Sequence, residues 1–332
     1  MKQHILVARA IPQPVLARLA EHFEVEANLD DAIFSAEELK QRLQGKSGAF
    51  TTGTERIDAA LLDACPLLRA VCNMAVGYNN FDVEACTARG VLCTNTPDVL
   101  TETTADFGFA LMMTAARRIA ESERFLRRGE WTKWSFDMFT GGDVHGATLG
   151  VLGMGRIGQA IARRGALGFG MPVIYHNRSR LGAAAEAQLG ARHVSKEALL
   201  READHLVIVV PYSPATHHAV GASELALMKP TATLTNIARG GVVDDAALAA
   251  ALRERRIAAA GLDVFEGEPT VHPDLLVVPN VVLTPHIASA TVATRLAMAD
   301  LAADNLIAAL GCGPRAGRPP TPINPQVQQP TA

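Results

Sequence analysis

The chain has 332 residues, of which 48% are hydrophobic and 20% charged, with a formal net charge of −3. This length predicts two domains with ample apolar material for their cores. The slightly acidic balance argues against a nucleic-acid partner, and no uncharged apolar run approaches the roughly 18 residues typical of a membrane span. The five cysteines form no Cys-x-x-Cys pair, so we expect unpaired thiols and a cytoplasmic location.

The first hundred residues alternate between short apolar segments and amphipathic helical patterns. This alternation predicts an α/β unit with a parallel sheet. The expected strands are residues 5–8, 23–26, 48–51, 68–73 and 91–94, and the expected helices are 14–21, 36–44, 58–64 and 82–89.

A long helical segment is expected over residues 101–128, followed by an irregular, aromatic connector over 129–146. The second α/β series then begins near residue 148, and a final helix is expected over 290–310, followed by an extended or partly disordered tail over 313–332. The expected strands of the second series are 148–152, 172–176, 205–210, 232–237, 258–262 and 281–284.

This order predicts two parallel-sheet α/β domains of the Rossmann-like or flavodoxin-like kind, with the active site in the cleft between them. We expect a discontinuous substrate domain over 1–100 and 287–332. The nucleotide-binding domain is expected over 101–286.

The most specific motif is a Gly-x-Gly-x-x-Gly sequence between an expected strand and an expected helix, formed by Gly153, Gly155 and Gly158. Gly153 permits a tight turn, Gly155 lets the backbone approach a pyrophosphate, and Gly158 lets the helix pack on the strand. The helix N-terminus offers N–H groups to phosphates. The motif therefore predicts a dinucleotide site that includes Arg156 and Ile157.

The loop after the next strand lacks the carboxylate that binds the ribose 2′-hydroxyl in NAD sites. It reads Asn177-Arg178-Ser179-Arg180, and arginine pairs with phosphate through its planar fork. We therefore expect NADP to be preferred over NAD. The alternative interpretation is a solvated basic loop.

Three successive strand ends in the second half carry residues suited to reduction of a 2-keto acid: Arg239, the acids Glu266 and Glu268, and His286. A guanidinium can hold the substrate carboxylate, and an imidazolium can protonate the carbonyl oxygen. A carboxylate beside the histidine would orient it and favour its charged form. Each residue alone could be an ordinary surface group, and the sequence distinguishes Glu266 from Glu268 only weakly. No spacing suggests a metal site.

These motifs together resemble the D-isomer-specific 2-hydroxyacid dehydrogenases. The resemblance covers roughly residues 5–310. Within the family, the chain looks most similar to the bacterial glyoxylate/hydroxypyruvate reductases, also called 2-ketogluconate reductases. It rests on the glycine motif, Asn236-Ile237-Ala238-Arg239-Gly240, Gly261-Leu262-Asp263-Val264-Phe265 with Glu268-Pro269, and Pro285-His286-Ile287-Ala288-Ser289.

The resemblance implies a role for each matching residue. Arg239 would bind the substrate carboxylate, Glu268 would be the partner of His286, and His286 would be the acid/base. Backbone N–H groups of Val76 and Gly77 would bind the substrate carboxylate, and Leu100 would line the substrate pocket. Further cofactor contacts would come from Thr104, Pro211, Thr216, Ile237, Ala238 and Asp263. The resemblance also implies a homodimer.

Relatives of other specificity narrow the expected substrate. Phosphite dehydrogenases carry Lys where this chain has Val76, and formate dehydrogenases carry Gln where it has Glu268, so neither substrate is expected. Glyoxylate, hydroxypyruvate and 2-ketogluconate remain open as substrates. The alternatives are an NAD-dependent dehydrogenase of other specificity, such as a phosphoglycerate-like one, and a nucleotide-sensing co-repressor-like binding protein.

Overall fold

The computed structural model describes residues 2–327 and divides the chain into two compact units. The first unit comprises Met1–Leu100 and Thr291–Ala332, and the second comprises Thr101–Ala290. Among the described helices, none is both long and apolar enough to cross a bilayer.

The first unit contains a five-stranded parallel sheet in the order β2-β1-β3-β4-β5. This is the doubly wound order of flavodoxin-like domains. Its strands are β1 (Gln3–Val7), β2 (Phe23–Ala27), β3 (Gly48–Thr51), β4 (Ala70–Asn73) and β5 (Leu92–Thr94). Its helices are α1 (Gln13–His22), α2 (Ala36–Leu43), α3 (Ala59–Ala64), α4 (Val83–Ala88) and α13 (Val292–Ala309).

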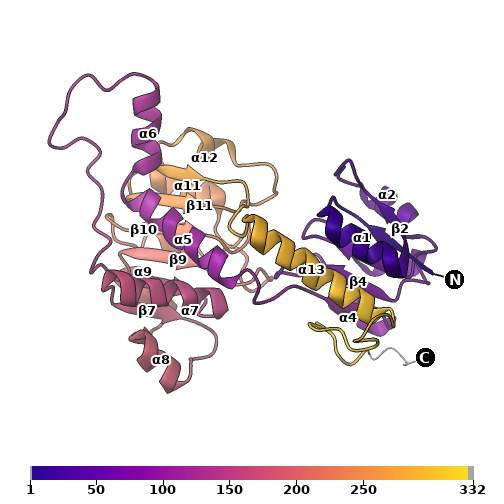
Figure 1. Ribbon diagram of the computed structural model, residues 1–332. Helices are drawn as coiled ribbons and strands as arrows, with labels where there is room; N and C mark the ends of the chain where they lie inside the picture. The colour runs from indigo at the N-terminus through magenta and orange to yellow at the C-terminus, as the bar shows by residue number, and fades with distance from the viewer. Residues whose placement is uncertain (1, 328–332) are drawn as a thin grey trace. The chain divides into compact units, whose positions relative to one another are not determined.

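Both faces of this sheet are buried, because alternate residues of each strand pack into different clusters. Ile5 and Val7 of β1 join the cluster beneath α1 and α13, whereas Leu6 joins the cluster with α2 to α4. The C-terminal α13 lies beside α1 and against β3 and β4 (Figure 1). Helix α13 is therefore part of the first unit's core.

The second unit contains a seven-stranded parallel sheet in the order β12-β11-β10-β9-β6-β7-β8. Its strands are β6 (Leu149–Leu152), β7 (Val173–His176), β8 (Ala191–His193), β9 (His205–Ile208), β10 (Thr233–Asn236), β11 (Ala259–Leu262) and β12 (Val281–Leu283). Its helices are α5 (Thr101–Ala116), α6 (Ile119–Arg127), α7 (Arg156–Arg163), the π-helical turn η1 (Arg164–Gly168), α8 (Ala183–Leu189), α9 (Lys196–Glu202), α10 (Ala222–Leu225), α11 (Asp245–Arg253) and α12 (Pro273–Val277).

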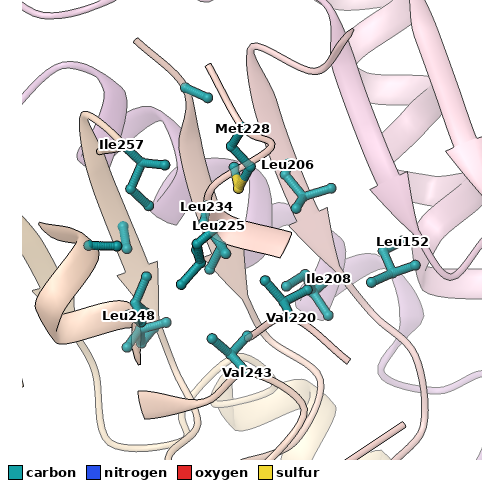
Figure 2. Packing of buried hydrophobic residues seen from close by; sticks show 14 of the residues in the cluster. Leu152, Leu206, Ile208, Val220, Leu225, Met228, Leu234, Val243, Leu248 and Ile257 are labelled. Carbon is teal, nitrogen blue, oxygen red and sulfur yellow. The ribbon is translucent and has the colours of Figure 1, made fainter. Parts of the chain in front are cut away.

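This is the Rossmann order, in which the chain crosses over between the neighbouring strands β6 and β9. One face packs against α5 and α7, and the other against α9 to α12. Figure 2 shows the second of these cores, where Leu206, Ile208 and Leu234 of the central strands meet Leu225 and Leu248. Because the strands are parallel, their C-terminal ends and the loops that follow them lie along one edge of the sheet.

The helical segment expected over residues 101–128 consists of two helices, because the helix breaks after α5. Arg118 adopts a left-handed conformation with φ of 52°, which interrupts the helical hydrogen bonds, and α6 starts at Ile119. The connector stabilises the break, because the N–H of Gly142 donates to the freed carbonyl of Ala116 at 3.0 Å.

The C-terminal segment packs against the edge of the first unit's sheet. Thr94 and Pro322 form an antiparallel bridge, and the N–H of Ile323 donates to the carbonyl of Cys93 at 2.8 Å. Residues 322–324 thus cover the open edge of β5. The rest of the expected tail, 328–332, lies outside the described residues.

Candidate active site

The glycine motif forms the turn from β6 into α7, with Gly155 at the N-cap. A Cβ at Gly158 would lie 2.2 Å from the carbonyl oxygen of Gly153, whereas a Cβ at Gly155 would meet no atom within 4 Å. The helix therefore packs directly on the loop at Gly158, and the backbone at Gly155 is open to a ligand. The first turn of α7 presents N–H groups there that have no intrahelical acceptor. This geometry fits a dinucleotide pyrophosphate.

Several predicted cofactor contacts lie around the crossover between β6 and β9, where open α/β sheets bind ligands. Pro211 and Thr216 belong to the loop after β9, and the Thr216 hydroxyl donates to the Pro211 carbonyl at 2.8 Å. Ile237 and Ala238 are buried after β10, and Thr104 is buried in α5, which packs against α7.

In the loop after β7, the two arginines have different surroundings. Arg180 forms a two-pronged ion pair with Glu186, with distances of 2.9 and 2.7 Å. The Arg180 guanidinium and the Tyr175 hydroxyl lower the pKa of Glu186 to about 2. Arg178 is exposed and, within residues 2–327, has no ion-pair partner. Arg180 therefore anchors the loop, and Arg178 remains available to a ligand.

Arg239 follows β10 in a tight turn. The side chain of Asn236 accepts from the Ala238 N–H at 3.0 Å and donates to the Arg239 carbonyl at 3.3 Å. A Cβ at Gly240 would lie 1.7 Å from the carbonyl oxygen of Phe265, so only glycine lets this turn meet the loop after β11. Burial lowers the pKa of Arg239, and the Glu268 carboxylate opposes that shift. The Arg239 charge is therefore partly shielded from solvent and close to a carboxylate.

His286 contacts Glu268, not Glu266. The Nδ1 atom of His286 lies 2.8 Å from Oε2 of Glu268, whose Oε1 accepts from the Phe265 N–H at 2.8 Å. Burial would raise the pKa of Glu268, but the hydrogen bond and charge of His286 prevail and hold it below its ordinary value. Glu268 is thus an ionised carboxylate that fixes the orientation of the His286 ring through Nδ1.

Asp263 holds the loop that carries His286. Its buried carboxylate accepts from the N–H groups of Ile287 and Ala288 and from the Thr284 hydroxyl, at 2.7 to 2.9 Å. The N–H of His286 also donates to the Asp263 carbonyl at 2.9 Å, and His286 itself has a positive φ of 54°. Asp263 therefore stabilises the loop that carries His286, a role that the sequence did not predict. The resemblance implies only a cofactor contact for this residue.

Glu266 belongs to a separate cluster on the same sheet edge. The Nε2 atom of His218 lies 2.8 Å from Oε2 of Glu266, and His217 stacks on His218 with ring centroids 3.9 Å apart. Ligand atoms of all three lie within 4.8 Å of one another. The spacing along the chain gives no sign of this grouping, because Glu266 comes from a different loop.

The three substrate contacts implied in the first unit lie after two of its strands. Val76 and Gly77 form the loop after β4, and Leu100 is buried just before α5. The amide nitrogens of Asn95 and Asn73 donate to the carbonyls of Val76 and Gly77, at 2.8 and 3.0 Å. No sequence motif identifies these two asparagines, and only their places at strand ends could have suggested them.

Several known proteins are similar to this chain in sequence and in fold. Residues 109–288 match the family model of the D-isomer specific 2-hydroxyacid dehydrogenase, NAD binding domain. Glyoxylate reductase of Thermococcus onnurineus is 50% identical over 312 residues, which cover 93% of each chain. Glyoxylate/hydroxypyruvate reductase B of Klebsiella pneumoniae is 46% identical over 314 residues, covering 93% of this chain and 96% of the relative.

Among solved structures, one similar to this chain is the NADPH-dependent glyoxylate/hydroxypyruvate reductase of Sinorhizobium meliloti, in complex with NADP and malonate. It is 38% identical, with a TM-score of 0.88 and full coverage of both chains. The match extends through both parallel-sheet units and so covers more than the nucleotide-binding half. The chain therefore belongs to the D-isomer-specific 2-hydroxyacid dehydrogenases, a family of NAD(P)-dependent oxidoreductases.

Proposed function

We propose that this protein is an NADPH-dependent reductase that converts small 2-keto acids, glyoxylate and hydroxypyruvate first among them, to D-2-hydroxy acids. The observation that carries the proposal is the His286–Glu268 pair at 2.8 Å, on the same sheet edge as Arg239 and the glycine loop. Relatives named for these reactions support the choice of substrates.

The roles follow from the chemistry of each group. The bound cofactor supplies a hydride to the carbonyl carbon. Arg239 binds the substrate carboxylate through its planar fork and polarises the neighbouring carbonyl. His286 gives the proton on Nε2 to the carbonyl oxygen, and Glu268 stabilises the imidazolium before that transfer. Reduction thus begins with charged His286 and ends with neutral His286.

The substrate domain in this proposal is the first unit, where the N–H groups of Val76 and Gly77 bind the substrate carboxylate. The second unit is the nucleotide-binding domain. Its predicted cofactor contacts include Asn177 and Ser179 beside Arg178, together with the glycine motif and the loops after β9, β10 and β11.

A turnover panel tests the proposal directly. Purified protein is assayed with glyoxylate, hydroxypyruvate and 2-ketogluconate, each with NADPH and with NADH. We expect reduction of at least one of them with NADPH. Turnover of other 2-hydroxyacids with NAD alone would favour a dehydrogenase of different specificity, and nucleotide binding without turnover would favour a co-repressor-like role.

Removal of Arg178 should weaken catalysis with NADPH and spare NADH. Arg178 is the unpaired cation of the loop, and loss of one charge-assisted contact of about 1.5–3 kcal/mol corresponds to about 10- to 150-fold in kcat/KM. Steady-state kinetics of Arg178→Ala with both cofactors measures the effect. The control is Arg192→Ala, which removes an exposed arginine of β8, the strand beside β7; Arg192 is paired with Glu202 of α9. Equal efficiency of the unmodified protein with both cofactors would contradict the proposed preference.

Glu268→Gln should move the alkaline limb of the reductive kcat/KM profile to lower pH. Glutamine keeps a hydrogen-bond acceptor but removes the negative charge that stabilises the imidazolium. Because the pKa of Glu268 lies below its ordinary value of 4.5, the carboxylate is ionised across the neutral range, so its charge is absent only in the variant. The pH profile is compared with that of Glu266→Gln, whose carboxylate contacts His218 instead. An unshifted limb in Glu268→Gln would show that another group supports His286.

A homodimer accompanies this proposal. The helix α6 buries none of its residues, and α6 and the connector expose large apolar side chains, namely Ile119, Leu126, Trp131, Trp134 and Phe136. We expect a second copy of the chain to cover this apolar surface, because the family resemblance implies a homodimer. Sedimentation velocity measures this assembly.

The five unpaired cysteines suit the reducing cytoplasm.

A further inference from the structure

The loop of Val76 and Gly77 has the form of a prepared hydrogen-bond donor site. Both of its carbonyls are occupied by asparagine side chains, Asn95 and Asn73. Within residues 2–327, no group accepts a hydrogen bond from the N–H of Val76 or of Gly77. Each peptide plane joins a carbonyl to the N–H of the next residue, so the Val76 carbonyl, which Asn95 holds, sets the direction of the Gly77 N–H. The Ala75 carbonyl, which accepts from the N–H of Thr96 beside Asn95 at 2.9 Å, sets the direction of the Val76 N–H.

Asn73 is held within its own loop region. It also contacts Asn80, whose amide donates to the carbonyls of Thr52 and Glu55 at 3.0 and 2.9 Å. These contacts come from neighbouring turns of the N-terminal segment.

Asn95 is instead held by the opposite end of the chain. Its carbonyl accepts from the Thr321 hydroxyl at 2.6 Å, across 226 residues of sequence, and from the Asn305 amide at 3.4 Å. Thr321 and Asn305 also bind each other twice, at 2.7 and 2.9 Å. Asn305 is fully buried in α13. The result is a continuous chain of contacts, the C-terminal brace, which runs from Asn305 and Thr321 through Asn95 to Val76.

We propose that the C-terminal brace positions the Val76–Gly77 loop for the substrate carboxylate, which makes Thr321 and Asn95 positioning residues for substrate binding. The inference rests on the proposed function, because it takes a 2-keto acid as the ligand of that loop. It assigns a task to the C-terminal segment beyond covering the edge of β5.

The experiment compares Thr321→Val, Thr321→Ser and Asn95→Asp with the unmodified protein. Valine keeps the shape of Thr321 but removes the hydroxyl, and serine keeps the hydroxyl. Aspartate at 95 replaces a donor by an oxygen that repels the Val76 carbonyl. We expect KM for glyoxylate to rise about 3- to 10-fold in Thr321→Val and about 10-fold or more in Asn95→Asp. The value of kcat and the Kd of NADPH should stay within about twofold, and Thr321→Ser should match the unmodified protein.

Asn28→Asp is the matched control. Asn28 is a buried asparagine of the same unit whose amide holds the carbonyls of Ala8 and Ala32 and contacts neither the loop nor the brace. This variant should lose stability without a change in KM. Equal rises in KM for Asn28→Asp and Asn95→Asp would show a general loss of stability and overturn the proposal.

Amide hydrogen exchange of residues 74–80 separates this inference from the proposed function. Exchange should accelerate in Thr321→Val and Asn95→Asp even without substrate, because the loop loses its support. If exchange accelerates but the unmodified protein reduces no 2-keto acid, the proposed function fails and the brace stands only as a structural support. Unchanged exchange and unchanged KM in both variants would overturn the inference.

Discussion

Replacement of His286 by alanine should lower kcat for reduction by about 10²- to 10⁴-fold, the usual contribution of general acid catalysis. The structure explains why one side chain has so large an effect. Glu268 fixes Nδ1 of His286 at 2.8 Å, and Asp263 holds the loop that carries it. No second imidazole of the described chain has both an acidic partner and a place in the loop after β12.

The measurement is single-turnover and steady-state reduction with the Kd of NADPH determined in parallel. Because His286 acts on the substrate carbonyl, nucleotide affinity should change little. His218→Ala is the comparison, since His218 also lies 2.8 Å from a glutamate on the same sheet edge. A similar loss in both variants, or near-normal turnover in His286→Ala, would assign the proton transfer elsewhere.

Arg239→Lys should reduce kcat/KM for the keto acid by about 10- to 150-fold, through both a higher KM and a lower kcat. Lysine keeps the positive charge but loses the planar fork that binds a carboxylate with two parallel hydrogen bonds. A charge-assisted hydrogen bond contributes about 1.5–3 kcal/mol, and the loss of one of the two gives this range.

Inhibition by oxalate provides an independent readout for Arg239. Oxalate is a dicarboxylate that cannot be reduced, so its Ki reports carboxylate binding without the chemical step. The Ki should rise in Arg239→Lys, while the Kd of NADPH stays constant. Normal KM and Ki values in this variant would show that another cation binds the substrate.

The sequence by itself determined the features that depend on residues near one another in the chain. Alternating apolar segments predicted the parallel strands, because both faces of such a sheet are buried. The glycine spacing placed the β6–α7 turn, because a Cβ at Gly158 would collide with the backbone of Gly153. The positions of Arg239 and His286 at strand ends could also be predicted, because the strands that precede them are short, apolar and easy to recognise.

Tertiary structure decided the choices between chemically similar residues. Glu266 and Glu268 are two positions apart, yet they contact different histidines, because the loop after β11 turns between them. Arg178 and Arg180 look equivalent in sequence, but only Arg180 meets Glu186 on α8. The break at Arg118 depended on a distant connector that supplies the N–H of Gly142.

The contact between Thr321 and Asn95 is the clearest example of a feature that the sequence alone does not predict. Neither residue belongs to a motif, and 226 positions separate them. Their pairing exists only because α13 returns the end of the chain to the first unit's sheet and brings residues 321–324 to the edge of β5. Local periodicity carries no information about such a pairing, because the free energy that stabilises the pairing comes from the packing of the assembled fold.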